Sequence, residues 1–385
     1  MSKVRLGIIG FGNMGSGHTK NIMEGLIPEI ELTAIADLNP DRRAAAKELL
    51  GDSVKIFESG SDLIRGGVCD AILIAVPHYQ HPILAMEGFD NNLHVMCEKP
   101  AGVYTKQVRE MNEAAGKTDR VFAMMFNQRT NCVFRKMKEI VSSGELGAIK
   151  RVNWLITDWY RTQAYYDSGD WRATWSGEGG GVLLNQCPHN LDLLQWICGM
   201  PSCVQAFCHN GKWHDIEVED DVTAYLEYPN GATGVFITST ADAPGTNRFE
   251  ITGEYGKLVC ENDKLTFHKL SVNEREFNKT AKGGFDKPPC EVFEVETDGL
   301  NLQHVAVLNA FAANILRGEP LVANGIEGIN GLTLSNAMHL SSWQKQPVDL
   351  PIDEDLFLAK LDEHRATSRR KENVKATTFD TSNSY

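Results

Sequence analysis

The chain has 385 residues, of which 42% are hydrophobic, and a formal net charge of −13 at pH 7. This length exceeds what one hydrophobic core usually organises, so we expect two domains. The negative charge disfavours nucleic acid and anionic membranes as partners, because both are polyanions that the protein would repel. The sequence shows neither a signal-peptide pattern nor an apolar run of the ~20 residues that a membrane span needs, which favours a cytoplasmic protein.

The first 127 residues alternate short β-rich segments with amphipathic helical segments, the order of a doubly wound parallel sheet. Strands are predicted at 4–10, 31–37, 71–76, 94–97 and 121–125, and helices at 14–25, 40–50, 80–89 and 105–116. Asn39 and Thr105 are the expected N-caps of the second and the last of these helices. The pattern predicts an N-terminal α/β Rossmann domain, 1–127.

Beyond residue 127 the pattern predicts an α+β domain, 128–365, with a large, mostly antiparallel sheet. A helix at 134–142 precedes strand-like segments with turn signals such as Pro229-Asn230-Gly231, and further helices are predicted at 302–316 and 325–343. The last segment, 366–385, is polar, and we expect it to be disordered or to cross a neighbouring subunit.

The nine cysteines form no C-x-x-C pair, and their odd number does not suit a disulfide framework. We therefore expect reduced, mostly buried thiols. Cys187, His189 and Asp192 stand close together as potential metal ligands, but Pro188 separates the first two and the sequence offers no fourth ligand nearby. No metal site is expected.

A glycine-rich motif stands where the first predicted strand gives way to the first helix. It reads Gly10-Phe11-Gly12-Asn13-Met14-Gly15 and fits G-x-G-x-x-G. The glycines allow a tight turn, a close approach of backbone N–H groups to phosphate, and close helix–strand packing, while the helix N-terminus favours negative charge. The motif predicts a pyrophosphate-binding site.

Asp37 ends the next predicted strand, about 20 residues further on, where a carboxylate accepts hydrogen bonds from ribose hydroxyls and repels a 2′-phosphate. Leu38 follows it and is assigned to the same cofactor site. Arg42 and Arg43 lie close behind and could contact a 2′-phosphate if Asp37 turned away. We expect NAD rather than NADP.

Two further segments, taken together with the glycine-rich motif, resemble those of a known family. They are Cys97-Glu98-Lys99-Pro100 and Gly179-Gly180-Gly181-Val182-Leu183-Leu184-Asn185-Gln186-Cys187-Pro188-His189-Asn190-Leu191-Asp192. With the glycine-rich motif they resemble the Gfo/Idh/MocA oxidoreductases, the family of glucose–fructose oxidoreductase and inositol dehydrogenase. The resemblance extends to about residue 365 and implies an NAD-dependent enzyme that acts on CH–OH groups and assembles as a homodimer or homotetramer.

The resemblance also implies which residues contact the cofactor. Lys99 would act at the reacting carbon, while Glu98 and Pro100 would place the nicotinamide ribose. The other residues that it implies at the cofactor are Ala75, Val76, Pro77, His78, His81, Asn127, Trp171 and Arg172.

Oxidation of a secondary alcohol requires a base for the hydroxyl proton and a group that stabilises the developing alkoxide. Lys99 and His189 can supply these functions. Pro188 favours a helix start, and the positive end of that helix would keep the His189 imidazole neutral. Asp192 lies three residues further on, where it could orient the ring or form a salt bridge elsewhere.

Asn185 departs from the family pattern, because many members carry aspartate there as part of a Lys-Asp-His set. Asparagine cannot take a proton, although it can donate and accept hydrogen bonds. We expect Asn185 to orient a sugar hydroxyl or His189, with His189 and Lys99 as candidate bases. The alternative is a helix-entry asparagine without ligand contact.

Aromatic and polar residues gather at 158–175, just before this motif. Aromatic rings stack on sugar rings, and Asp, Asn and Arg bind pairs of hydroxyls. Tyr165, Tyr166 and His304 are the candidate substrate contacts, with core packing as the alternative for about half of the aromatic side chains. The pattern favours a small carbohydrate or cyclitol as the substrate.

The sequence therefore predicts an NAD-dependent dehydrogenase that reversibly oxidises a secondary hydroxyl of a sugar, glycoside or cyclitol, with a 3-oxo sugar as the narrower expectation. Lys99, His189 and Asn185 are its candidate catalytic residues. Two alternatives are a glycoside-cleaving enzyme with transient oxidation and a redox-silent NAD-binding sensor. Asn185 favours the sensor, whereas Lys99 and His189 together count against it.

Overall fold

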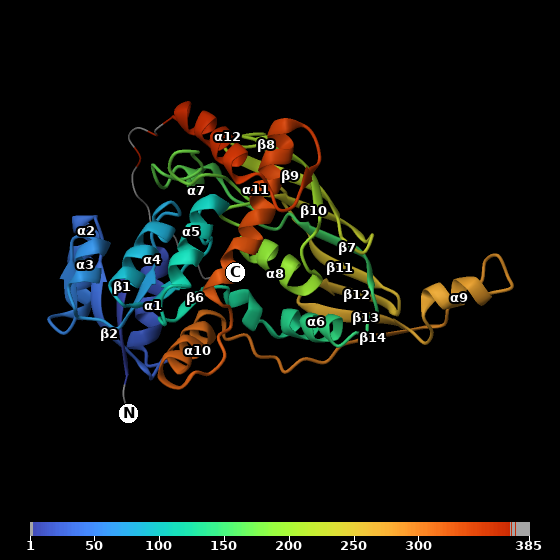
Figure 1. Cartoon of the computed structure of the whole chain (residues 1–385), viewed down its shortest axis with the longest axis horizontal. Coiled ribbons are helices and arrows are strands. Elements are labelled where there is room, and N and C mark those ends of the chain that lie inside the picture. The colour runs from blue at the N-terminus through green and yellow to red at the C-terminus, as the bar shows by residue number, and fades with distance from the viewer. Residues whose placement is uncertain (1–2, 370, 372–373, 375–385) are drawn as a thin grey trace.

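Two sheets organise the computed structural model, which describes residues 3–369 together with 371 and 374. Figure 1 shows the smaller sheet, near the N-terminus, beside the larger one. No helix in this described part is both long enough and apolar enough to cross a membrane.

The N-terminal sheet has six parallel strands in the order β3-β2-β1-β4-β5-β6. Its strands are β1 (Val4–Ile9), β2 (Ile30–Ala36), β3 (Lys55–Phe57), β4 (Ala71–Ile74), β5 (His94–Cys97) and β6 (Phe122–Met124). Every residue of β4 is buried, as expected for a parallel strand covered on both faces. The order reverses between β1 and β4, and in open α/β sheets ligands bind in the crevice at the carboxyl ends of the strands beside such a reversal. The predicted Rossmann fold is confirmed.

The helices of this domain follow the prediction closely. They are α1 (Asn13–Met23), α2 (Pro40–Leu50), α3 (Gly60–Arg65), α4 (Gln80–Asp90) and α5 (Thr105–Ala115). Asn39 caps α2 as expected, accepting a hydrogen bond of 2.8 Å from the Asp41 N–H. The prediction for Thr105 was wrong, because Tyr104 is the N-cap of α5 and the Thr105 N–H instead donates to Asn336 of the second domain, at 3.0 Å.

The second sheet has nine strands in the order β14-β13-β12-β11-β7-β10-β9-β8-β15. They are β7 (Ile149–Ile156), β8 (Cys203–Asn210), β9 (Glu219–Glu227), β10 (Thr233–Ser239), β11 (Asn247–Gly253), β12 (Gly256–Glu261), β13 (Lys264–Leu270), β14 (Cys290–Glu294) and β15 (Val348–Asp349). Only β7 and β10 pair in parallel within this described sheet. Buried residues alternate along β9 and β10, so one face is packed and the other is open. The mostly antiparallel sheet is confirmed.

The remaining helices pack between and beside the sheets. They are η1 (Asn127–Thr130), α6 (Cys132–Ser142), α7 (Gln163–Tyr166), α8 (Pro188–Cys198), α9 (Glu274–Thr280), α10 (Gln303–Arg317), η2 (Gly325–Glu327), α11 (Gly328–Gln344) and α12 (Glu354–Ala366). Leu308 and Phe311 of α10 share a core with Leu6 and Ile8 of β1, and Figure 1 shows α10 beside the first strands. The core of the N-terminal domain therefore includes residues far beyond 127.

The predicted tail, 366–385, lies largely outside the described residues. Its described part contacts its own chain: the Ser368 hydroxyl donates to Glu217 at 2.7 Å, and the Lys371 Nζ donates to the Tyr166 carbonyl at 2.7 Å. At these positions the chain therefore packs on its own second domain.

Candidate active site

The glycine-rich motif forms the turn from β1 into α1. Gly10 has φ +97°, and a Cβ at Gly15 would lie 1.8 Å from the Gly10 carbonyl oxygen, so both positions require glycine for packing. Gly12 differs, because a Cβ there would meet nothing nearer than the Arg42 guanidinium at 3.5 Å. It therefore leaves open space above the N-terminus of α1, where a phosphate would approach backbone N–H groups.

Asp37 follows β2 and turns its carboxylate toward this loop. It accepts hydrogen bonds from the N–H groups of Phe11 at 2.7 Å and Asn39 at 2.8 Å. Arg43 donates to the carbonyls of Asp37 and Leu38. The half-exposed Arg42 lies 3.7 Å from the Asp37 carboxylate. The carboxylate thus occupies the position that favours NAD over NADP.

The segment after β4 is tied to the Glu98-Lys99-Pro100 segment by a buried histidine. The two ring nitrogens of His81 lie 2.7 Å from the carbonyl oxygens of Pro100 and Val76. Ala75 is held to β1 through its N–H, at 2.8 Å from the Ile9 carbonyl. His81 therefore fixes the crevice wall, while its own ring atoms are already engaged.

Glu98 lies in a cluster of histidines that sequence reasoning did not anticipate in full. His18 of α1 contacts the Glu98 carboxylate at 2.8 Å, and the His304 ring packs edge-on against the His18 ring. Burial opposes ionisation of Glu98, but the His18 hydrogen bond and the neighbouring positive charges outweigh it and lower its pKa to about 2. Burial, then the His18 charge, lowers the pKa of His304 to about 4.

Lys99 follows β5 and reaches across to the second domain. Its Nζ donates to the backbone carbonyl of Asn185 at 3.1 Å. Burial lowers the pKa of Lys99, while the charge of Glu98 opposes that shift. A lysine with a lowered pKa at the edge of the crevice suits a role in proton transfer or alkoxide stabilisation.

His189 is the second residue of α8, as the Pro188 signal predicts. Its side chain is only 4% exposed, yet neither ring nitrogen has a hydrogen-bond partner among the described residues. Burial, and next the charge of Lys99, lowers the pKa of His189 well below its ordinary value. The ring is therefore neutral at physiological pH and available to a ligand.

Asp192 does not orient His189. Its two carboxylate oxygens receive hydrogen bonds from Arg129 at 2.8 and 2.7 Å, and Gln195 adds one at 3.0 Å. Both partners of the Arg129–Asp192 ion pair are almost fully buried. This pair joins η1 to α8, so Asp192 serves the packing of the second domain against the crevice.

Asn185 lies at the centre of a polar network. Its Nδ2 donates to the Glu178 carboxylate, and its Oδ1 accepts a hydrogen bond of 3.2 Å from the Tyr165 hydroxyl. Arg172 donates to the same hydroxyl at 2.8 Å and lies over the Tyr165 ring. Asn185 is therefore held on both sides, and sequence reasoning missed Glu178 as its partner.

The two tyrosines predicted as substrate contacts have different surroundings. Tyr165 carries guanidinium groups on its ring, from Arg161 at 5.2 Å and Arg172 at 4.6 Å, beside Asn185. Tyr166 is 2% exposed, and its hydroxyl donates to Thr240 at 2.8 Å. We keep Tyr165 as a candidate contact and correct Tyr166 to a core residue.

A buried glutamate holds the loop that precedes Asn185. The Glu219 carboxylate accepts hydrogen bonds from the N–H groups of Gly181 and Leu183 and pairs with His339 at 3.0 Å. A Cβ at Gly181 would lie 2.0 Å from the Glu219 carbonyl oxygen, so this position needs glycine. The Glu219 carboxylate thus fixes the backbone of this loop at Gly181 and Leu183.

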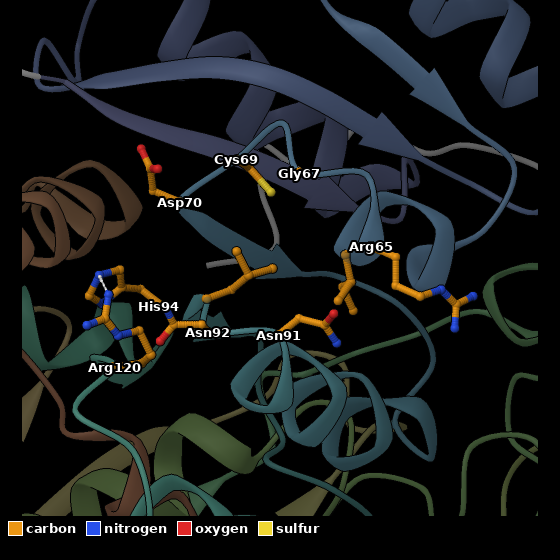
Figure 2. Close-up of a pocket in the computed structure, with 10 residues that line it drawn as sticks. Arg65, Gly67, Cys69, Asp70, Asn91, Asn92, His94 and Arg120 are labelled. Atoms are coloured by element: carbon orange, nitrogen blue, oxygen red, sulfur yellow. Dashed lines mark hydrogen bonds between the residues drawn. The ribbon is translucent and has the colours of Figure 1, made fainter.

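A separate hollow lies at the opposite edge of the parallel sheet. Figure 2 shows Asp70 and His94, at the amino ends of β4 and β5, among its lining residues. Asp70 is paired with Arg5 at 2.5 Å. The candidate site residues instead follow the carboxyl ends of β1, β2, β4 and β5, so this hollow is distinct from the site. Within the described residues, no group of three potential ligands is placed to hold a metal ion.

The crevice fits a dinucleotide. Gly12 provides the space for a phosphate, Asp37 faces the loop, and the Oδ1 of the fully buried Asn127 has no partner among the described residues. Trp171 packs edge-on against His78 on the side of the second domain. Together with Lys99, these features define a dinucleotide-dependent oxidoreductase.

Comparison with known families identifies the class more closely. Residues 4–126 match an oxidoreductase family with an NAD-binding Rossmann fold, and residues 134–259 match the Gfo/Idh/MocA C-terminal domain. Together these matches cover more than half of the chain. The chain belongs to the Gfo/Idh/MocA family, and NAD is its cofactor.

Several relatives align over most of the chain. It is 27% identical to the myo-inositol 2-dehydrogenase of Thermotoga maritima, over 90% of this chain and 98% of the relative. The D-glucoside 3-dehydrogenase of Escherichia coli is 27% identical over 62% of this chain and 71% of its own. The structure of the WlbA dehydrogenase from Bordetella pertussis, in complex with NADH and UDP-GlcNAcA, has a TM-score of 0.78 at 26% identity, over 92% of this chain and 99% of that one.

Proposed function

We propose that this protein reversibly oxidises a secondary hydroxyl of a sugar, glycoside or cyclitol with NAD as the hydride acceptor. The observation that carries this proposal is the placement of Lys99 and His189 at the crevice, where the Lys99 Nζ donates to the Asn185 carbonyl just before the helix that bears His189. His189 is buried, and both of its ring nitrogens lack partners among the described residues, while Lys99 lies close enough for its charge to act on the ring.

Each residue has a chemical task in this reaction. The bound NAD supplies the acceptor for the hydride that leaves the carbon. The neutral His189 accepts the hydroxyl proton, because its lowered pKa keeps it unprotonated at physiological pH. The Lys99 ammonium stabilises the negative charge that develops on the oxygen. Asn185 and Tyr165 position the substrate through hydrogen bonds, and His304 borders the same site beside Glu98.

The substrate class is supported by the relatives. Their names specify oxidation of a cyclitol and of position 3 of a glucoside. A 3-oxo sugar is the narrower product that we propose. Arg161 and Arg172 place two guanidinium groups on the Tyr165 ring beside Asn185, so a test panel should also contain sugar acids.

The proposal is tested by NADH formation at 340 nm across free sugars, glycosides, inositols and uronates at alkaline pH. Absorbance growth that Lys99→Ala and His189→Ala abolish is the expected result. Release of an aglycone without net NADH would instead support glycoside cleavage with transient oxidation. NAD binding without any turnover across the panel would support a sensor, to which the amide at position 185 points.

A further inference from the structure

Glu178 is a buried carboxylate that no step above uses. It is 2% exposed and stands at the start of the loop that leads to Asn185. One of its oxygens accepts a hydrogen bond of 2.6 Å from the Ala173 N–H, and the other accepts the Asn185 Nδ2. Its backbone carbonyl also contacts the His78 ring at 3.2 Å. Its side chain therefore joins Ala173 to Asn185, and its backbone carbonyl connects the loop to the wall of the crevice.

The carboxylate determines which way the Asn185 amide points. A carboxylate oxygen accepts hydrogen bonds, so the side of the amide that faces Glu178 must be the NH₂ group. The amide oxygen consequently faces the opposite way, where it accepts the Tyr165 hydroxyl at 3.2 Å and the Gln186 amide at 3.3 Å. Without Glu178, neither orientation of the amide would be enforced from that side.

Glu178 also acts on the charged groups of the site. Its negative charge raises the pKa of Lys99, against the larger opposing effect of burial. Burial raises the pKa of Glu178 itself, while the charge of Arg172 and the hydrogen bonds from Ala173 and Asn185 counter that shift. The carboxylate is thus electrostatically coupled to both domains.

We propose that Glu178 is the positioning carboxylate of this active site, acting through Asn185 and on Lys99, so that the carboxylate and the amide function as one pair. Only the kinetic test of this inference rests on the proposed function. Glu178 touches no reacting atom in this scheme. It fixes the amide oxygen toward Tyr165, and both Glu178 and Lys99 bond Asn185, the first through its side chain and the second through its backbone carbonyl.

If Glu178 and Asn185 act as a pair, position 185 must carry an amide as long as position 178 carries a carboxylate. Asn185→Asp would set two carboxylates against each other in a buried site, where like charges disfavour ionisation. Glu178→Gln would remove the charge and leave two amides. The double variant Glu178→Gln/Asn185→Asp exchanges the groups and restores one carboxylate facing one amide. If the pair works as a unit, the double variant should exceed both single variants.

The test measures kcat and KM for these three variants with the best substrate of the panel. Each single variant should lose roughly 10- to 100-fold in kcat with little change in KM for NAD, and the double variant should recover most of that loss. Glu217→Gln is the matched control, since Glu217 contacts Trp175 and Ser368 but no member of the pair. A double variant that is no better than the worse single variant would overturn the proposal.

A second readout does not depend on turnover. The reaction of Lys99 with an amine-selective acylating reagent, followed by mass spectrometry over a range of pH, reports the fraction of free amine. Glu178→Gln should shift that profile to lower pH, and the exchanged pair should shift it back. An unshifted profile contradicts the proposed role of Glu178, even if the enzyme is active. A shifted profile in a protein that oxidises no substrate of the panel supports the role of Glu178 and refutes the proposed function.

Discussion

Lys99 is a cation in surroundings that penalise charge, because burial lowers its pKa. Lys99→Met should lower kcat about 100- to 1000-fold, since a preorganised charge is lost where the alkoxide develops. The dissociation constant of NAD, measured by quenching of tryptophan fluorescence, should change little. Lys106→Met is the control, because Lys106 pairs with Asp355 on the surface. Equal losses in both variants would argue against a role for Lys99 in the chemistry.

His189 should set the acid limit of the reaction. Burial places its pKa well below the ordinary value, so the base form persists down through pH 6.5 and is lost only at lower pH. A profile of kcat/KM for the alcohol should therefore fall on the acid side below pH 6.5. His189→Asn should remove that limb along with most of the activity. An acid limb retained in this variant would assign the base to another residue.

The residues of the candidate site were only partly predictable from the sequence. Lys99 and His189 stand in motifs that can be recognised from the sequence alone. Glu178 stands in no such motif, because its role depends on its contact with the Asn185 amide, seven residues away, which forms only when the loop between them folds. His18 contacts Glu98, which lies 80 residues further along the chain. For Asp192 the sequence left two roles open, and the structure shows the salt bridge, because the buried Arg129 offers a stronger, charged partner than His189.

At the scale of elements, the three glycines of the β1–α1 turn should separate binding from folding. Gly12→Ala fits the space and should leave the melting temperature nearly unchanged, while weakening NAD binding because the methyl group takes the place of a phosphate oxygen. Gly15→Ala cannot fit beside the Gly10 carbonyl and should destabilise the fold. Thermal melting with and without NAD distinguishes the two. Intact NAD-induced stabilisation in Gly12→Ala would place the phosphate elsewhere.

Strands that form apolar runs between turn signals were predicted well, whereas the short strand β3, which forms no such run, was missed. The strands at 71–76 and 94–97 are apolar runs between turn signals, and the structure has strands there. β3 has only three residues, and the sequence offered no period to detect. The N-cap was misplaced at Thr105 because a threonine before an apolar pattern usually caps, whereas its N–H bonds Asn336 in the other domain.

At the scale of the whole molecule, buried neutral histidines should make the fold sensitive to acid. The pKa values of His78, His189 and His304 are all lowered, chiefly by burial. Groups with lowered folded-state pKa values stabilise the fold above their unfolded value of 6.5 and lose that contribution as the pH falls. For His304, whose pKa is about 4, the loss amounts to about 3 kcal/mol.

Urea unfolding at several pH values measures this dependence. The free energy of unfolding should drop steadily from pH 6.5 to pH 4, and His304→Gln should flatten part of the drop. A constant free energy over this range would contradict the assignment of buried neutral rings.

The arrangement of the two domains was less predictable than either domain alone. The sequence suggests a simple division at residue 127, but α10 returns to pack on β1. Such a return depends on which apolar faces remain uncovered once the strands have assembled, and local patterns do not encode this.

The transfer of hydride from substrate carbon to cofactor is the central claim, and isotopic labelling tests it most directly. The best substrate of the panel, deuterated at its ring carbons, would be incubated with NAD and enzyme, and the cofactor analysed by mass spectrometry. Our account predicts NADH one mass unit heavier, formed more slowly than with unlabelled substrate and about 100- to 1000-fold more slowly by Lys99→Met. Product formation with cofactor that never acquires deuterium would contradict it.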